Sequence, residues 1–302
     1  MRKTYIFLAI LALFSFNSAD SFDAATKRVP SDFYKWLSSA KLPRELTFCG
    51  ERIPLENPDT YERADREFYL LLQQPGQIIM YVKRAGRYFP AMEKVLREEG
   101  APDDLKYLAV AESALMQGAT SGKGAHGLWQ FMPATARQFG LVVNDYVDER
   151  RDPVKSARAA IRYLKAGYER HKSWILAAAG YNMGDGRVSG SLDNQGSTNF
   201  FDLWLNEETS RYIFRIAIIK EIMQNAKEYG FDVSPDYHYK PYESDTVTVT
   251  EAIQDLSAWA KANGTNFREV RLRNPWITGK ALPRPTKDAW TLEIPKTRNT
   301  EN

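Results

Sequence analysis

Helical periodicity from about residue 60 to about residue 230 is the feature that most constrains the fold of this 302-residue chain. Apolar side chains recur there every three or four residues, as on the buried face of an amphipathic helix. We predict helices over these ranges: 60–72, 78–97, 102–115, 133–139, 155–171, 174–181 and 207–229. Pro90 would kink or break the second helix, and Gly230 would stop the last one. The stretch from 20 to about 60 is punctuated by prolines and looks irregular.

A different pattern begins near residue 242. Two β-prone runs, 246–249 and 290–295, flank two helical stretches at 253–262 and 267–272, which predicts a β-α-α-β module. A module of about 55 residues is too small for a secure core of its own, so it should pack against the helical part. The fold class we predict is therefore mainly α, with a small C-terminal α+β module.

The first 19 residues have the pattern of a secretory signal peptide. Arg2 and Lys3 supply positive charge, Tyr5–Phe16 is apolar, and Ala19 is a small residue before the expected cleavage point. The apolar stretch is shorter than the roughly 20 residues that a membrane span needs. Because the bulky Asn17 weakens the cleavage signal, an uncleaved N-terminus that associates with the membrane is the alternative.

Composition argues against several classes of partner. The chain carries 41 basic and 38 acidic residues, and the leader is basic, so the remainder is close to neutral. This balance gives no reason to expect nucleic acid as a partner. His126, His171 and His238 lie far apart, without the spacing of a zinc site. The glycines from 118 to 127 lack the preceding strand and the following Lys-Ser/Thr of a phosphate-binding loop.

A glutamate stands where the helical pattern calls for an apolar side chain. In the predicted helix 102–115, Leu105, Leu108, Ala109 and Glu112 recur at i, i+3, i+4 and i+7, so the carboxyl lies on the core-facing stripe. Burial disfavours the charged carboxylate, which lets a carboxylic acid donate a proton near neutral pH. The alternative is a structural glutamate at the edge of the apolar face, paired or reaching toward water.

Four short motifs follow one another along the helical part. They are Glu112-Ser113, Gly127-Leu128-Trp129-Gln130, Ala179-Gly180-Tyr181-Asn182 and Tyr212-Ile213. In this order and at these spacings they resemble the lytic transglycosylases of lysozyme-like fold, and most of all the membrane-bound lytic murein transglycosylases. The resemblance runs from about residue 70 to about residue 230. Gly180 replaces an alanine that is common in the family, and Trp129 stands where methionine is frequent.

The resemblance implies an organisation and a site. A lysozyme-like catalytic domain would occupy 96–232, between an N-terminal helical extension at 20–95 and the small module at 242–297. Glu112 would be the catalytic residue. The substrate-binding residues would be Ser113, Gln130, Tyr181, Asn182 and Tyr212. The family needs no metal or organic cofactor, and we expect a monomer that acts on peptidoglycan glycan strands after export across the inner membrane, in the periplasm or cell envelope.

The resemblance also implies a reaction that one carboxyl can perform. Glu112 would protonate the glycosidic oxygen between N-acetylmuramic acid and N-acetylglucosamine, and then accept the proton of the muramic C6 hydroxyl as a 1,6-anhydro ring closes. Ordinary glycosidases need a second carboxyl. The candidates for it are Asp145, Asp148, Glu149 and Asp152, which cluster in one segment at the start of a helix. Asp148 and Asp152 are better interpreted there as helix caps and partners of the helix dipole.

Two other functions stay open. One is a hydrolase of goose-lysozyme type that uses water, and the other is a non-catalytic scaffold that binds the cell wall. The C-terminal module resembles a degenerate LysM sugar-binding repeat, but the usual Gly-Asp turn is absent after Val249. The module could therefore bind glycan or serve only as a structural brace.

Overall fold

The computed structural model describes residues 31–285 and 289–296. The predicted signal peptide lies outside these residues. The chain divides into two compact units, 1–41 and 42–302, and the described part of the first contains helix α2 (Ser31–Ser39). Within the described ranges, no helix combines the length and the apolar character needed to cross a membrane.

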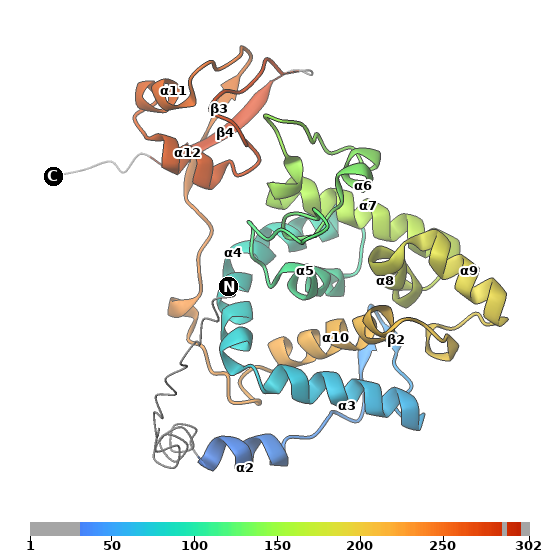
Figure 1. Ribbon diagram of the computed structural model, residues 1–302. Helices are drawn as coiled ribbons and strands as arrows, with labels where there is room; N and C mark the ends of the chain where they lie inside the picture. The colour runs from blue at the N-terminus through green and yellow to red at the C-terminus, as the bar shows by residue number, and fades with distance from the viewer. Residues whose placement is uncertain (1–30, 286–288, 297–302) are drawn as a thin grey trace, which may run out of the picture. The chain divides into compact units, whose positions relative to one another are not determined.

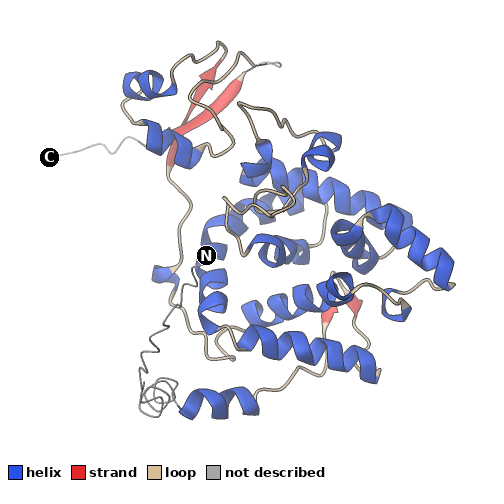
Figure 2. Cartoon of the chain, in the orientation of Figure 1, coloured by secondary structure: helices blue, strands red, loops and turns tan. Residues whose placement is uncertain are grey.

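Helices dominate the second unit (Figures 1 and 2). They are α3 (Pro58–Leu72), α4 (Pro75–Glu98), α5 (Lys106–Ser113), α6 (Pro133–Gln138), α7 (Pro153–His171), α8 (Trp174–Met183), α9 (Asp185–Gln195) and α10 (Glu207–Gln224). One-turn 3-10 helices lie at Asp103–Leu105, Glu149–Arg151, Phe200–Asp202 and Pro235–Tyr237. The predicted mainly α class is confirmed.

Some predicted boundaries were wrong. Helix α4 continues through Pro90, so the predicted break is wrong, whereas the alternative of a kink at Pro90 stays a prediction. Helix α10 ends at Gln224 rather than near 229, because Asn225 leaves the helical conformation while its side-chain amide donates to the Glu221 carboxylate at 2.9 Å. Helix α9 was not predicted, and its sequence is rich in glycine and polar residues with Val188 as its buried apolar side chain. The proline-rich stretch before residue 60 contains α2 and a short hairpin of β1 (Thr47–Phe48) and β2 (Glu51–Arg52).

Side-chain caps mark the beginnings of α7, α8 and α10. Asp152 accepts hydrogen bonds from two backbone N–H groups in the first turn of α7. Ser173 caps α8 in the same way, and Asn206 caps α10. Each such cap stabilises its helix by about 1 kcal/mol, because it satisfies N–H groups that have no partner within the helix.

Helix α10 is the centre of the helical core. It lies between α3 and α5, and it also packs against α4 and α8 (Figure 1). Its buried residues are Thr209, Tyr212, Ile213, Phe214, Ile216, Ala217, Ile218, Ile219 and Ile222. A helix with apolar residues on most of its circumference is stable only when other helices surround it. This central place brings Tyr212 to the end of α5.

The C-terminal module is a two-stranded antiparallel sheet with two helices. Strands β3 (Ser244–Val249) and β4 (Trp290–Pro295) pair in register from Ser244 with Pro295 to Val249 with Trp290. Helices α11 (Leu256–Ala262) and α12 (Phe267–Arg273) connect them along the chain (Figure 2). The predicted β-α-α-β order is confirmed.

The module shares its apolar core with the helical part of the chain. Val147, from the segment before α7, is fully buried in the cluster formed by the module. It forms a β-bridge with Ile277, and the N–H of Asp148 donates to the carbonyl of Trp276 at 2.7 Å. The small module thus gains buried area from its neighbour, as its size requires.

Candidate active site

Glu112 lies in the last turn of α5, at a cleft of about 920 Å³. The other members of its stripe, Leu105, Leu108 and Ala109, are fully buried, which confirms the predicted apolar face. Ala114 ends the helix in the left-handed conformation, with φ of 54°, and its N–H donates to the Val110 carbonyl at 2.8 Å. The carboxyl therefore stands where the core face of the helix meets the cleft.

The structure brings most of the predicted site residues to this one cleft. The predicted residues that line it are Glu112, Gln130, Tyr181, Asn182 and Tyr212. They come from α5, from the loop before α6, from α8 and from α10. Ser113 is buried and does not line the cleft. The Asn182 side-chain oxygen accepts a hydrogen bond from the Thr209 hydroxyl at 2.8 Å, which links α8 to α10.

Tyr212 holds the Glu112 carboxyl. Its hydroxyl donates a hydrogen bond to Glu112 Oε1 at 2.5 Å, and only 6% of the residue is exposed. Burial raises the pKa of Glu112 to about 7, against the opposing effects of the Tyr212 hydrogen bond and the Arg215 charge, while Glu208 adds to the rise. A carboxyl with such a pKa exists in both forms near neutral pH, so it can donate a proton and later accept one.

We expect Tyr212→Phe to raise the pKa of Glu112 further, by about one unit, because the lost hydrogen bond stabilises the carboxylate. A carbon-13 NMR titration of the Glu112 carboxyl measures this directly. Tyr229→Phe is the matched control, because its hydroxyl is bonded to Glu221 instead. An unchanged or lowered pKa in Tyr212→Phe would contradict the assigned contact.

The loop between α5 and α6 is shaped by a close backbone approach. Gly127 has φ of 83°, and a Cβ atom there would lie 2.0 Å from the carbonyl oxygen of Arg150. Only glycine combines that conformation with that distance. Gln130 also has a positive φ, of 47°, and its side-chain nitrogen donates to the carbonyls of Ala119 at 3.1 Å and Gly127 at 2.8 Å. The glycine-rich motif is therefore a rigid wall of the cleft.

Two predicted residues tie this loop to the helices around it. The buried hydroxyl of Ser113 lies 2.9 Å from the Leu128 carbonyl. The Tyr181 hydroxyl donates to the carbonyl of Trp129 at 2.7 Å. Trp129 itself is fully buried. Ser113 thus supports the loop from behind rather than from within the cleft.

A buried ion pair fixes the same loop from the other side. The guanidinium of Arg150 binds both carboxylate oxygens of Asp148, each at 2.8 Å, and its remaining nitrogen donates to the carbonyls of Gly124 and Phe131 at 2.9 and 3.0 Å. The two side chains are only 10% and 6% exposed. Sequence reasoning missed Arg150, because nothing in the local pattern shows that its side chain reaches back to the loop.

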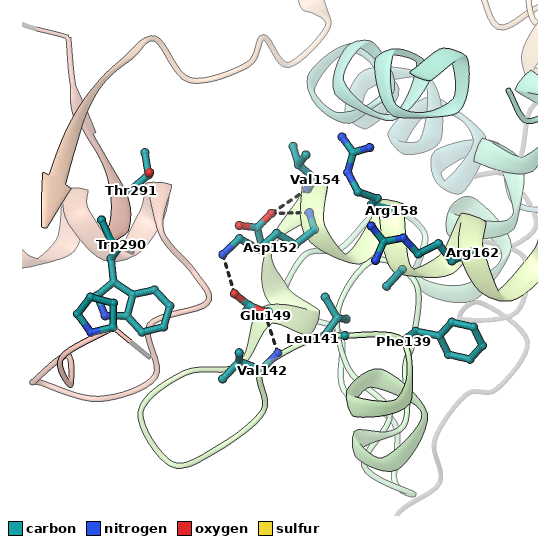
Figure 3. Close-up of a pocket in the computed structure, with 15 residues that line it drawn as sticks. Phe139, Leu141, Val142, Glu149, Asp152, Val154, Arg158, Arg162, Trp290 and Thr291 are labelled. Atoms are coloured by element: carbon teal, nitrogen blue, oxygen red, sulfur yellow. Dashed lines mark hydrogen bonds and ion pairs between the residues drawn. The ribbon is translucent and has the colours of Figure 1, made fainter. Parts of the chain in front are cut away.

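The acidic residues considered for a second carboxyl lie away from the cleft. Figure 3 shows a separate cavity of about 520 Å³, where Glu149 binds the Lys155 ammonium at 2.6 Å and Asp152 caps α7. Asp148 caps the preceding 3-10 helix, so the interpretation of Asp148 and Asp152 as caps is confirmed. Neither these three nor Asp145 lines the cleft of Glu112.

Three other carboxyls do line the cleft, and sequence analysis did not consider them. Glu67, only 5% exposed, accepts a hydrogen bond from Arg211 Nε at 2.5 Å. Glu207 binds Arg66 at 2.8 Å. Glu208 is exposed and adds its charge to the field at Glu112. In the parts of the chain that the structure describes, no group of three or more His, Cys, Asp or Glu is arranged to hold a metal ion.

A carboxyl of raised pKa, set at the edge of an open polar cleft among packed helices, is the arrangement of a lysozyme-like domain. Residues 90–203 match the family model of the transglycosylase SLT domain. This match confirms the resemblance to the lytic transglycosylases that the four motifs indicated. Residues 245–298 match the soluble lytic transglycosylase C-terminal LysM-like domain. The exact domain boundaries we gave remain a prediction.

The chain is also similar to individual proteins over part of its length. Over 188 residues the chain is 30% identical to membrane-bound lytic murein transglycosylase D of Escherichia coli (strain K12), covering 61% of this chain and 41% of that protein. Among solved structures, an inactive mutant of the lytic transglycosylase Slt from Pseudomonas aeruginosa is 24% identical with a TM-score of 0.39, covering 50% of this chain and 26% of the other. The 70 kDa soluble lytic transglycosylase of Escherichia coli is 23% identical with a TM-score of 0.40, covering 51% and 27%. The chain thus spans less than half the length of each.

Proposed function

We propose that this protein is a lytic transglycosylase that cleaves the β-1,4 bond between N-acetylmuramic acid and N-acetylglucosamine in peptidoglycan. The observation that carries the proposal is Glu112, whose carboxyl has a pKa of about 7 and is held by Tyr212 at an open polar cleft. The segment that contains Glu112 matches the transglycosylase SLT domain. Glycan strands are the proposed partner, and the cell envelope is the proposed location.

In the proposed reaction one carboxyl acts twice. Protonated Glu112 donates its proton to the glycosidic oxygen, and the bond from that oxygen to C1 of the muramic residue breaks. The C6 hydroxyl of the same sugar bonds to C1, and its proton passes to the Glu112 carboxylate, which returns to its starting form. No water enters and no metal is required. Because the attacking hydroxyl belongs to the substrate, its effective concentration is high without a second carboxyl to position it.

The positions of the remaining residues support the tasks we propose for them. Gln130, Tyr181 and Asn182 line it and would contact the sugars, while Tyr212 keeps the acid oriented. Ser113 would act indirectly by supporting the loop that carries Gln130. A polar cleft of about 920 Å³ has room for several sugar units of an extended strand.

A digest of purified peptidoglycan by the chain without its leader tests the proposal. We expect products that end in 1,6-anhydro-N-acetylmuramic acid, identified by mass spectrometry. Products heavier by one water would mean a hydrolase of goose-lysozyme type, with Glu208 as the carboxylate to examine, because it lines the cleft and its charge acts on Glu112. Strand binding without any products would mean a scaffold.

A further inference from the structure

A side cavity of about 330 Å³ adjoins the cleft of Glu112. The two share Glu67, Arg211 and Arg215 in their linings, so the side cavity continues the cleft along α3 and α10. Its apolar lining includes Ile218 and Ile219, both buried in the core. These five residues lie outside the segment 90–203 that matches the SLT domain.

One arginine that lines the side cavity, Arg215, has no ion-pair partner among the residues the structure describes. Arg211 is held by the buried carboxylate of Glu67, at 2.5 Å, and lies 3.6 Å from Glu207. Arg215 follows one turn later on the same face of α10. It is exposed, and it makes no hydrogen bond or ion pair with any residue the structure describes. Glu67 and Arg211 offset each other, so the lining as a whole keeps one positive charge.

A free guanidinium at the wall of a substrate cleft has one preferred ligand chemistry. Its planar N–H groups match a carboxylate in two parallel hydrogen bonds, and such charge-assisted bonds are about twice as strong as neutral ones. Because Glu67 offsets the charge of Arg211, the net positive charge of the lining is that of Arg215, and it favours an anion over a neutral group. Because Glu67 holds the Arg211 side chain, Arg211 forms a fixed part of the cavity wall. The guanidinium of Arg215 remains available to a ligand.

We propose that the side cavity is a subsite for a carboxylate carried by the substrate, with Arg215 as the residue that binds it. This inference rests on the proposed function and deepens it. In peptidoglycan, free carboxylates belong to the lactyl group of muramic acid once its peptide is removed, or to the stem peptide itself. The enzyme would therefore cleave strands that bear these carboxylates in preference to strands in which they are blocked.

The test compares Arg215→Gln with the unchanged protein on four substrates. They are strands with stem peptides, strands without them, and each of these two after amidation of its carboxyls. Assays near pH 5 keep Glu112 protonated in both proteins, so the effect of Arg215 on that acid does not enter. We expect kcat/KM on carboxylate-bearing strands to fall about tenfold, through KM. On amidated strands the two proteins should be equal. Arg215→Lys, which keeps the charge, should restore part of the loss.

The arms separate the two sources of the carboxylate. A loss confined to strands with peptides assigns the subsite to the stem, and a loss on stripped strands assigns it to the lactyl group. Arg63→Gln is the matched control: it removes the same charge from α3, but Arg63 pairs with Asp59 and lines neither cavity. An equal loss on free and amidated strands, or no loss on either, would overturn the subsite.

The results distinguish failure of the subsite proposal from failure of the proposed function. If the unchanged protein makes anhydro-ended products while Arg215→Gln keeps the same preference among substrates, the function stands and the subsite falls. If no products form, the Kd of each kind of strand is measured instead, for the unchanged protein and for Arg215→Gln. A tenfold weaker binding of carboxylate-bearing strands alone would then still support the subsite.

Discussion

We expect Glu112→Gln to lower the rate of the proposed strand cleavage by about 10⁴-fold, because glutamine has nearly the same shape as glutamate but can neither donate nor accept the transferred proton. The amount of anhydro-ended product formed per hour from purified peptidoglycan measures the effect. Glu208→Gln is the comparison in the same cleft, and we expect a far smaller loss, since Glu208 only adds charge near the acid. Equal losses in the two variants would favour a hydrolase with two carboxyls.

The same substitution has an expected effect on stability that depends on pH. The pKa of Glu112 is about 7 in the folded protein against 4.5 for an ordinary glutamate. Below pH 4.5 both states are protonated, and the carboxyl adds no pH dependence. As the pH rises toward 7 the unfolded chain ionises first, so the native protein loses stability, by on the order of 3 kcal/mol once the pH exceeds 7.

Glu112→Gln therefore removes a destabilising group at alkaline pH. We expect the variant to have a higher free energy of unfolding than the unchanged protein at pH 8 and a similar one at pH 4. Urea unfolding at both values measures the difference. A gap of the same size at both pH values would show that the Glu112 carboxyl does not have the raised pKa that its role requires.

Asp148→Ala is the second change with a large expected effect. It leaves the guanidinium of Arg150 buried without its counter-ion, and breaking a buried pair in this way costs about 3–5 kcal/mol. Urea or guanidinium unfolding measures the loss. We also expect slower strand cleavage, since Arg150 holds the carbonyls of Gly124 and Phe131 in the loop that carries Gln130.

The chain contains a well-matched control for this ion pair. Arg52 also binds both oxygens of its partner, Glu56, at similar distances of 2.8 and 2.7 Å, but the two side chains are 59% and 62% exposed. Glu56→Ala should lower the free energy of unfolding far less than Asp148→Ala, because water screens an exposed pair. If Glu56→Ala and Asp148→Ala lowered the free energy of unfolding by similar amounts, burial would not increase the contribution of the Asp148–Arg150 pair to stability.

The helix of Glu112 could be predicted from the sequence because the pattern that defines it lies within a short stretch of chain. The spacing of Leu105, Leu108 and Ala109 defines one face, and that face is buried as expected. Helix α9 escaped prediction because it lacks such a stripe and has Val188 as its buried apolar residue. The end of α10 was misplaced because it depends on one side-chain contact, from Asn225 to Glu221.

The roles of particular side chains were harder to predict than their positions. Ser113 belongs to the motif of the acid, yet its hydroxyl contacts the carbonyl of Leu128 instead of the cleft. Glu67 and Arg211 face the cleft as a pair although about 140 residues of chain separate them. No periodicity or spacing can report such a contact, because it depends on how α3 packs against α10.

By itself, the sequence determined the helical character, the order of the β-α-α-β module and the residue most suited to be the acid, since hydrophobic periodicity and motif spacing act over short stretches of chain. Only the tertiary structure decided that burial and the Tyr212 hydroxyl shift the pKa of Glu112 in opposite directions, that Arg150 anchors the loop of Gln130, and that Arg215 has no hydrogen-bond or ion-pair partner among the described residues. These properties depend on the distance between side chains from different helices and on their exclusion from water, and both quantities arise when the helices pack around α10.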